Sequence, residues 1–350
     1  MNTTNQKALK QLIFLGFIFV TGISVFLYYN YKSNNLTKEF LKNGGFRRIK
    51  DSKIVKLSAE YNVPNDIYDL VDLDTVGNLI VKPYGKSEIW LFNNNQLNSK
   101  IALPKIMKSA SITKISKNSF QNNTIDLQCP NDRVIYSFNL LNKKLSNITF
   151  SDYVDKIVFV KNDEIVSFRS ENSANFSKIH HTKITNGKEE SLGKSDFMLH
   201  EMSEDGVLER YHKDLLYINF YNNKVYVIDS LLTKKQVFKT IDTITTKPAT
   251  VSIKNKTITK FIHAPRVVNR IMAVSGDLLY INSLVKSDND KDEDFNKNSL
   301  IDIYDLKQGG IYKKTIYIPK YNKEYFTDFI IKEKMLVLAY SDKIIKYEIK

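Results

Sequence analysis

The fold that we predict follows from residues 214–229, DLLYINFYNNKVYVID. Two strands rich in β-branched and aromatic residues flank a Tyr-Asn-Asn turn, and Asn tolerates the left-handed backbone that tight hairpin turns need. The first strand is apolar on both faces, which are formed by Leu215 and Tyr217 and by Leu216, Ile218 and Phe220. Such a strand must be covered on both sides. Blades stacked around an axis provide this cover, because each blade lies between two others.

The pattern of apolar strand, turn and second apolar strand occurs six times, and residues 277–282 repeat residues 214–219 verbatim. The hairpins span residues 78–92, 124–138, 156–168, 214–229, 277–304 and 335–349. The first strand begins at Leu79 in the first hairpin and at Met335 in the last, so the mean repeat over the five intervals is about 51 residues. This length fits a four-stranded blade with its loops. We therefore predict an all-β, six-bladed β-propeller over residues 52–350.

A polar, lysine-bearing segment follows most hairpins and is expected to form the outermost strand of its blade. These segments are residues 99–104, 144–149, 237–241 and 312–319. Lysine and a terminal proline discourage edge-to-edge pairing of exposed strands. The sixth hairpin has no such segment before Lys350, so we predict that Ser52–Leu57 supplies its outer strand and closes the ring.

The amino terminus carries a long uncharged run. A polar tail, residues 1–10, precedes the apolar run Leu12–Tyr29, and Tyr28, Tyr29 and Tyr31 lie where an interfacial aromatic belt belongs. At about 1.5 Å per residue the run approaches the ~30 Å thickness of the bilayer core. We predict a transmembrane helix over residues 11–31, with residues 12–29 in contact with the lipid bilayer. A cleaved signal peptide is the alternative, but no small-x-small cleavage pattern follows the run.

The orientation of this helix is ambiguous in the sequence. Lys7 and Lys10 precede it, whereas five basic residues follow it by Arg48, which favours a cytoplasmic domain. Long domains, however, translocate regardless of flanking charge. We expect a single-pass protein of the inner membrane with a periplasmic propeller, and an anchored cytoplasmic domain is the weaker alternative. Residues 32–51 are assigned to a solvated linker, whose basic cluster between Lys38 and Lys53 is an alternative contact for lipid headgroups.

The charge and cysteine content exclude several classes. The net charge is +14, but the lysines are spread along the chain without an Arg-rich or aromatic-interleaved patch, so no nucleic-acid partner is expected. The single Cys129 excludes an internal disulfide and does not identify the redox compartment. With 42% hydrophobic and 26% charged residues, the chain is long enough to bury a sizeable core.

Candidate metal ligands are few. His180 and His181 are adjacent, so on a regular strand they point to opposite faces and cannot bind one ion together. The other histidines are His200, His212 and His263. Asp288, Asp290, Asp292 and Asp294 match the start of a calcium loop, but Glu293 and Ser299 replace the Gly and Glu that the loop requires. We interpret residues 288–298 as a mobile, solvated loop with weak surface cation binding as the alternative, and we assign no metal site and no cofactor, calcium being the one candidate. After Tyr31, a helix is expected only near residues 36–41.

Two segments resemble known propeller families. Residues 74–81 and 85–92 resemble an NHL repeat, with Asp-x-x-Gly-Asn, a strand, a Gly turn and a second strand that ends in Phe92. Residues 300–319 are similar to late blades of TolB-like six-bladed propeller proteins of bacteria. The resemblance implies a binding scaffold rather than a particular chemistry. It also implies structural roles for Gly77 and Asn78 in a turn and for Phe92 between blades.

No linear motif identifies a catalytic residue: the sequence has no phosphate-binding Gly-rich loop, nucleophile elbow or zinc spacing. Trp90 and the tyrosines are expected in blade packing. We expect a non-catalytic, membrane-anchored module that binds a protein or small ligand at one face of the propeller. The alternative is a calcium-dependent hydrolase or lyase that uses the central channel. Carboxylates and histidines that converge in the channel favour the enzyme, and a channel lined by lysines and apolar residues favours docking.

Overall fold

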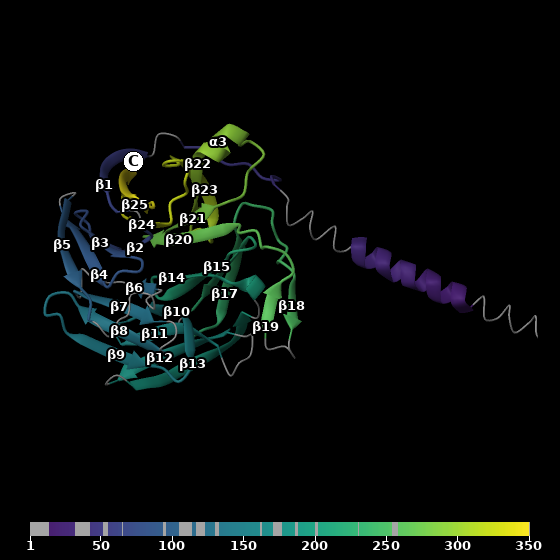
Figure 1. The fold of residues 1–350 in the computed structure, drawn as a ribbon, viewed down its shortest axis with the longest axis horizontal. Helices are drawn as coiled ribbons and strands as arrows, with labels where there is room; N and C mark the ends of the chain where they lie inside the picture. Colours follow the sequence, from purple (N-terminus) through teal and green to yellow (C-terminus); the bar gives the residue numbers. More distant parts are fainter. Residues whose placement is uncertain are drawn as a thin grey trace, which may run out of the picture. The chain divides into compact units, whose positions relative to one another are not determined.

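The structure is a computed structural model that describes residues 14–31, 43–51, 55–64, 66–93, 96–104, 114–116, 123–129, 133–161, 163–170, 177–185, 188–199, 202–229, 231–253 and 258–349. Its contacts divide the chain into two units, Met1–Lys42 and Asn43–Lys350. The second unit contains six four-stranded antiparallel sheets arranged as the blades of a propeller (Figure 1). The predicted all-β, six-bladed propeller is confirmed.

The blades follow one another along the chain, and within each blade the strands run outward from the centre in sequence order, except for the outermost strand of blade 6. Blade 1 contains β2 (Tyr68–Leu73), β3 (Leu79–Pro83), β4 (Glu88–Asn93) and β5 (Gln96–Ala102). Blade 2 contains β6 (Lys114–Ser116), β7 (Thr124–Cys129), β8 (Val134–Asn139) and β9 (Leu145–Thr149). Blade 3 contains β10 (Tyr153–Phe159), β11 (Glu164–Ser170), β12 (Ser177–Thr185) and β13 (Lys188–Leu199).

Blade 4 contains β14 (Gly206–Tyr211), β15 (Asp214–Asn219), β16 (Lys224–Ile228) and β17 (Lys234–Lys239), and the short 3-10 helix η2 (Met202–Glu204) precedes it. A two-stranded hairpin of β18 (Thr250–Ile253) and β19 (Ile258–Phe261) leads to the next blade. Blade 5 contains β20 (Asn269–Ser275), β21 (Leu278–Ser283), β22 (Asn298–Asp305) and β23 (Ile311–Pro319), with helix α3 (Asp292–Lys297) between β21 and β22. Blade 6 contains β24 (Asp328–Lys332), β25 (Met335–Ala339), β26 (Lys343–Ile349) and, outermost, β1 (Val55–Asn62).

Strand β15 is buried on both faces, as its sequence predicts. Leu215 and Tyr217 belong to a core that includes Phe168 of blade 3. Leu216 and Ile218 belong to a different core, shared with blade 5. Burying each such side chain contributes roughly 1.5–3 kcal/mol, so the contacts between blades hold the ring together.

Five of the six predicted hairpins form the second and third strands of their blades, and blade 3 differs. Its hairpin, β10 and β11, supplies the first and second strands, and β12 and β13 complete the sheet. These two strands carry mostly polar residues, so the apolar pattern that marks the other hairpins is missing from them.

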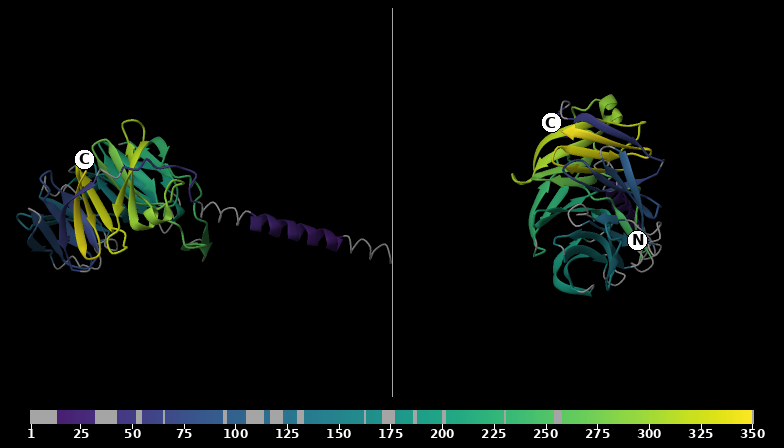
Figure 2. Two further views of the ribbon diagram at one scale, coloured as in Figure 1. Left: turned by 90° about the horizontal axis from the view of Figure 1, so that it is seen from above. Right: turned by 90° about the vertical axis from the view of Figure 1, so that its left-hand side faces the viewer.

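The ring closes between the two ends of the propeller unit. β1 pairs antiparallel with β26, from Val55 opposite Ile349 to Asn62 opposite Lys343. Figure 2 shows dark blue β1 beside the yellow carboxy-terminal strands. The prediction that the segment after the anchor supplies the outer strand of blade 6 is confirmed, although the strand extends five residues beyond Leu57. Residues 52–54 of the predicted segment lie outside the described residues.

The amino-terminal unit contains one described helix, Phe14–Tyr31. It is long and apolar enough to cross a membrane, and a signal sequence would pass the same test. The described helix lies within the predicted transmembrane residues 11–31. The tail, residues 1–10, and the segment 36–41, where a further helix was expected, lie outside the described residues.

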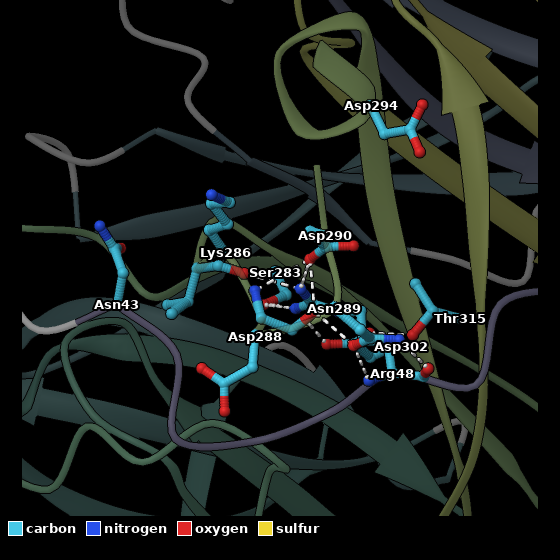
Figure 3. A network of polar contacts seen from close by, with 12 residues as sticks. Asn43, Arg48, Ser283, Lys286, Asp288, Asn289, Asp290, Asp294, Asp302 and Thr315 are labelled. Carbon is cyan, nitrogen blue, oxygen red and sulfur yellow. Dashed lines mark hydrogen bonds and ion pairs between the residues drawn. The ribbon is translucent and has the colours of Figure 1, made fainter. Parts of the chain in front are cut away.

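The last part of the expected linker is packed against blade 5. We name residues 43–51 the strap. The Arg48 side chain is fully buried and its guanidinium binds Asp302, Asp290, Ser283 and the carbonyl of Val285 (Figure 3). At the end of the strap, Lys50 bridges in parallel to Thr315 on β23. The interpretation of residues 32–51 as a solvated linker is therefore wrong for the strap, because burying Arg48 against two carboxylates fixes this segment.

Candidate functional site

A cleft of about 560 Å³ opens between blades 3 and 4, near the turns that follow their first strands. Its volume lies within the range of small-molecule sites in proteins. It is lined by Val160, Lys161, Glu164, Val166, His181, Leu192, Gly193, Arg210, His212, Lys213, Leu215, Leu231 and Leu232. These residues come from strands β11 to β15 and from the turns after β10, β14 and β16.

The floor of the cleft is apolar. Val166, Leu215 and Leu232 are buried. Two further leucines border the cleft and remain accessible to solvent, Leu192 on β13 at 47% exposed and Leu231 in the turn after β16 at 82% exposed. An apolar group bound here would remove part of this surface from water, which is the main driving force for ligand binding.

Glu164, at the start of β11, is the one carboxylate among the lining residues. It accepts a hydrogen bond from Lys161 Nζ at 2.7 Å and lies 3.1 Å from His181 Nε2. The hydrogen bond from Lys161, followed by the contact with His181, lowers the pKa of Glu164 below its usual range. The negative charge of Glu164 is therefore balanced by Lys161, which also lines the cleft.

Arg210 and Lys213 carry the positive charge of the opposite wall. Arg210 Nε donates to the backbone carbonyl of His212 at 2.8 Å, and Nη1 lies 3.4 Å from that of Phe159. In the part of the chain that the structure describes, neither cation forms an ion pair with a carboxylate. The cleft therefore combines an apolar floor with two cations whose charge no described carboxylate neutralises.

His212 lies at the edge of the cleft and contacts the next blade. Its Nε2 is 3.0 Å from Asp277 Oδ1, and the Tyr211 hydroxyl donates to the same oxygen at 3.1 Å. The hydrogen bonds from His212 and Tyr211 lower the pKa of Asp277. Asp277 thus remains ionised and holds His212 at the rim.

The structure separates the histidines that the sequence singled out. His181 and His212 both line the cleft, whereas His180 is not among the lining residues, in keeping with the alternation of side chains along β12. His263 is exposed in the segment after β19, and His200 lies outside the described residues. Sequence reasoning missed Lys161, Glu164, Arg210 and Lys213, because no linear spacing links residues from two neighbouring blades.

The acidic run in blade 5 binds the strap. Asp290 pairs with Arg48 (Figure 3). Asp288 accepts a hydrogen bond from the Gly45 amide at 2.8 Å, and Asp294 pairs with Lys50. Asp292 pairs instead with Lys286, and Ser299 is buried on β22. The interpretation of residues 288–298 as a solvated loop is wrong, because Asp290 is buried and residues 292–297, which include Glu293, form helix α3.

The four aspartates point to different partners rather than to one ion. Among the described residues, no group of three or more His, Cys, Asp and Glu side chains is placed to hold a metal. Lys156 on the innermost strand β10 pairs with Asp205, the residue before β14, at 2.7 Å. Asp328 on β24 accepts a hydrogen bond from the Leu70 amide on β2 at 2.8 Å, so both of these carboxylates have protein partners.

The motif residues of blade 1 have structural roles. Gly77 adopts a left-handed φ of +90°, and the Asn78 amide donates to Asp74 at 2.7 Å, so the pair forms the predicted turn. Phe92 packs between blades 1 and 6, with its ring centroid 5.1 Å from that of Tyr61. Trp90 is buried in the same core. These predictions are confirmed.

Comparisons with known proteins identify the fold. No family model matches the sequence, so membership in the NHL or TolB-like families is not confirmed, and no curated protein matches it either. A member of the DUF4221 family from Bacteroides vulgatus is similar in structure, with a TM-score of 0.57 and 12% identity over 86% of this chain and 99% of that chain.

Virginiamycin B lyase from Staphylococcus aureus has a TM-score of 0.52 and 14% identity over 84% of this chain and 99% of that chain. A streptogramin B lyase has a TM-score of 0.51 and 10% identity, over 85% and 98% of the two chains. At these identities the likeness shows the propeller fold alone.

Proposed function

We propose that this protein is a membrane-anchored β-propeller that binds a ligand in the cleft between blades 3 and 4 and acts as a binding module at the cell envelope. The observation that carries the proposal is the cleft, which combines a concave apolar floor with a few polar groups aimed into it, as ligand sites do. The resemblance in fold to propellers with varied functions leaves the function to be argued from this site.

The helix Phe14–Tyr31 supports the membrane anchor, and we propose that the propeller lies on the periplasmic side. Three measurements test this part. Mass spectrometry of the mature protein should find the intact amino terminus, and the protein should stay in the membrane after washing with alkaline carbonate. In spheroplasts, added protease should degrade the propeller. Protection from the protease would place the propeller in the cytoplasm, and a cleaved amino terminus would remove the anchor.

The ligand cleft is tested by filling it. Gly193 lines the cleft, and a Cβ atom added at this position meets no atom within 4 Å beyond its chain neighbours, so Gly193→Trp should place its ring in the cleft with the strand backbone unstrained. Small molecules that co-purify with the full-length protein should be lost in this variant. The matched control is Asn147→Trp, on the exposed outer strand of blade 2. Equal recovery from all three proteins would contradict the proposal.

The Glu164–His181 pair favours a second candidate, a hydrolase or lyase that works in the cleft. A carboxylate within hydrogen-bond distance of an imidazole fixes the orientation of the ring, as the site of a general base requires. Arg210 and Lys213 would then stabilise developing negative charge. Turnover of the co-purified molecule by the wild-type protein, lost in His181→Gln with binding retained, would distinguish this candidate from the binding module. The calcium-dependent enzyme of the central channel has no comparable observation in its favour.

A further inference from the structure

We infer that the cleft ligand is a small anionic amphiphile, with a carboxylate or phosphate group held by Arg210 and Lys213 and an apolar portion on the leucines of the cleft. The inference rests on the proposed function and names the chemical class of its ligand. It follows from the charge of the cleft, the anchoring of Arg210 and the position of the exposed leucines.

The charge of the cleft favours an anion. Its lining contains three cations, Lys161, Arg210 and Lys213, against the single carboxylate of Glu164, which leaves a net charge of +2 with the histidines neutral. Because Lys161 is paired with Glu164, the excess lies on Arg210 and Lys213. A cationic ligand would meet two like charges, whereas an anionic ligand would supply the missing partner.

The Arg210 guanidinium is held in place before any ligand binds. Its two hydrogen bonds go to backbone carbonyls, those of His212 and Phe159, and not to acidic side chains. Of the five N–H donors of an arginine, these bonds use two, so donors on both Nη atoms are left for an acceptor. Carboxylate and phosphate groups match this planar pair of donors in a bidentate geometry.

The apolar portion is required by the rest of the cleft. Leu192 and Leu231 come from neighbouring blades, border the same cleft and are among its most exposed apolar side chains. A free phosphate or a short carboxylate would fill little of the 560 Å³ and would leave both leucines in water. A ligand with an anionic head and an apolar body uses both parts of the site.

Binding of charge-matched probes to the full-length protein in lipid nanodiscs tests the inference. The probes are 4-phenylbutyrate and phenyl phosphate as anions, 4-phenylbutanol as a neutral analogue, 4-phenylbutylamine as a cation, and acetate as an anion without an apolar body. Titration calorimetry, with empty nanodiscs as the blank, gives the affinities. We expect at least one aromatic anion to bind about tenfold or more tightly than the neutral and cationic analogues and than acetate, with an affinity that falls as salt is added. A preference between the two anions identifies the head group.

Substitutions assign the effect to the cleft. Arg210→Gln with Lys213→Gln should reduce the affinity for the anion to that of the neutral analogue, and Gly193→Trp should abolish it. Lys239→Gln, an exposed lysine on β17 outside the cleft, should leave the affinity unchanged.

The outcomes separate the two proposals. If no probe binds, or if the probes bind equally whatever their charge, the anionic amphiphile is wrong. The binding module would still stand if Gly193→Trp removes the co-purified molecule. If that molecule is also insensitive to Gly193→Trp, the proposed function fails as well.

Discussion

Arg48 and Asp302 form a buried ion pair with two hydrogen bonds, from Nε to Oδ1 at 2.9 Å and from Nη2 to Oδ2 at 3.1 Å. The pair joins the strap to the third strand of blade 5. Asp290 also binds this guanidinium, and Asp242 lies close enough to interact with it electrostatically. Burial alone would lower the pKa of Arg48, but Asp302 and Asp290 more than offset it, so the pKa is raised and the charge is permanent. The strap is therefore fixed to blade 5 before the chain enters β1 of blade 6.

Arg48→Ala should destabilise the propeller by about 3–5 kcal/mol, because it leaves the carboxylates of Asp302 and Asp290 buried without their partner. Arg48→Lys should also be destabilising, since an ammonium group cannot reproduce the planar fork. Urea unfolding measures the change. Arg47→Ala is the matched control, because its side chain is exposed next to Arg48 and should shift the free energy of unfolding by less than about 0.5 kcal/mol. Equal effects of the two alanine variants would contradict the buried ion pair as a support of the strap.

Truncation should separate the strap from the closing strand. A chain that begins at Asn43 keeps both, and it should unfold in one cooperative transition. A chain that begins at residue 52 loses Arg48 and should be destabilised to the extent of Arg48→Ala. A chain that begins at residue 63 also loses β1 and exposes the edge of β26, so it should aggregate. Size-exclusion chromatography and thermal unfolding of the three chains check this order, and a monomeric, stable chain from residue 63 would contradict closure by β1.

Asp242 should make the stability of the propeller depend on pH. Burial, the largest cause, together with the nearby Asp302 charge raises its pKa to about 6 despite hydrogen bonds from Thr240 and the Ile244 amide. Because the pKa in the folded state lies above its ordinary value of about 4, the folded protein binds more protons between these values and loses stability as pH rises from about 4 to 6. Asp242→Asn should remove this loss and be more stable than the wild type above pH 6, by on the order of 2 kcal/mol.

The pH effect is measured as the difference in unfolding free energy between Asp242→Asn and the wild type at pH 4, 5, 6 and 7. The control is Asp292→Asn in helix α3, which makes the same substitution at a side chain that is 84% exposed. A difference that does not grow with pH would show that ionisation of the buried Asp242 does not destabilise the folded protein.

Glu164→Gln should tighten the binding of an anionic ligand. The substitution removes the only carboxylate among the described residues that line the cleft and releases Lys161 from its ion pair. A solvent-accessible charge pair is worth up to about 1 kcal/mol, so we expect an affinity about two- to fivefold higher for 4-phenylbutyrate. Calorimetry measures it, with Glu190→Gln on the exposed face of β13 as the control. Weaker binding in Glu164→Gln would indicate that Glu164 itself contacts the ligand.

The number and order of the blades were accessible from the sequence. Strands that are apolar on both faces, such as Leu215–Ile218, can be recognised from a few consecutive residues. Six such hairpins and their mean spacing therefore predict six blades. The sixth hairpin lacks an outer strand of its own in the sequence, and this predicted closure by the residues that follow the apolar helix. Blade 3 was less accessible, because the packing of its polar outer strands depends on their neighbours rather than on their own composition.

The propeller, its closure and one helix apolar enough to span a membrane follow from the amino-acid sequence alone, because each of these depends on the pattern of apolar residues along a continuous segment. The cleft and the role of the strap depend on contacts between residues far apart in the chain. Glu164 and Arg210 are 46 residues apart and line one cleft from two neighbouring blades, and Arg48 has the sequence context of a solvated linker. The interaction between two charged side chains depends on the distance between them in the folded protein, and the linear order of residues does not give that distance.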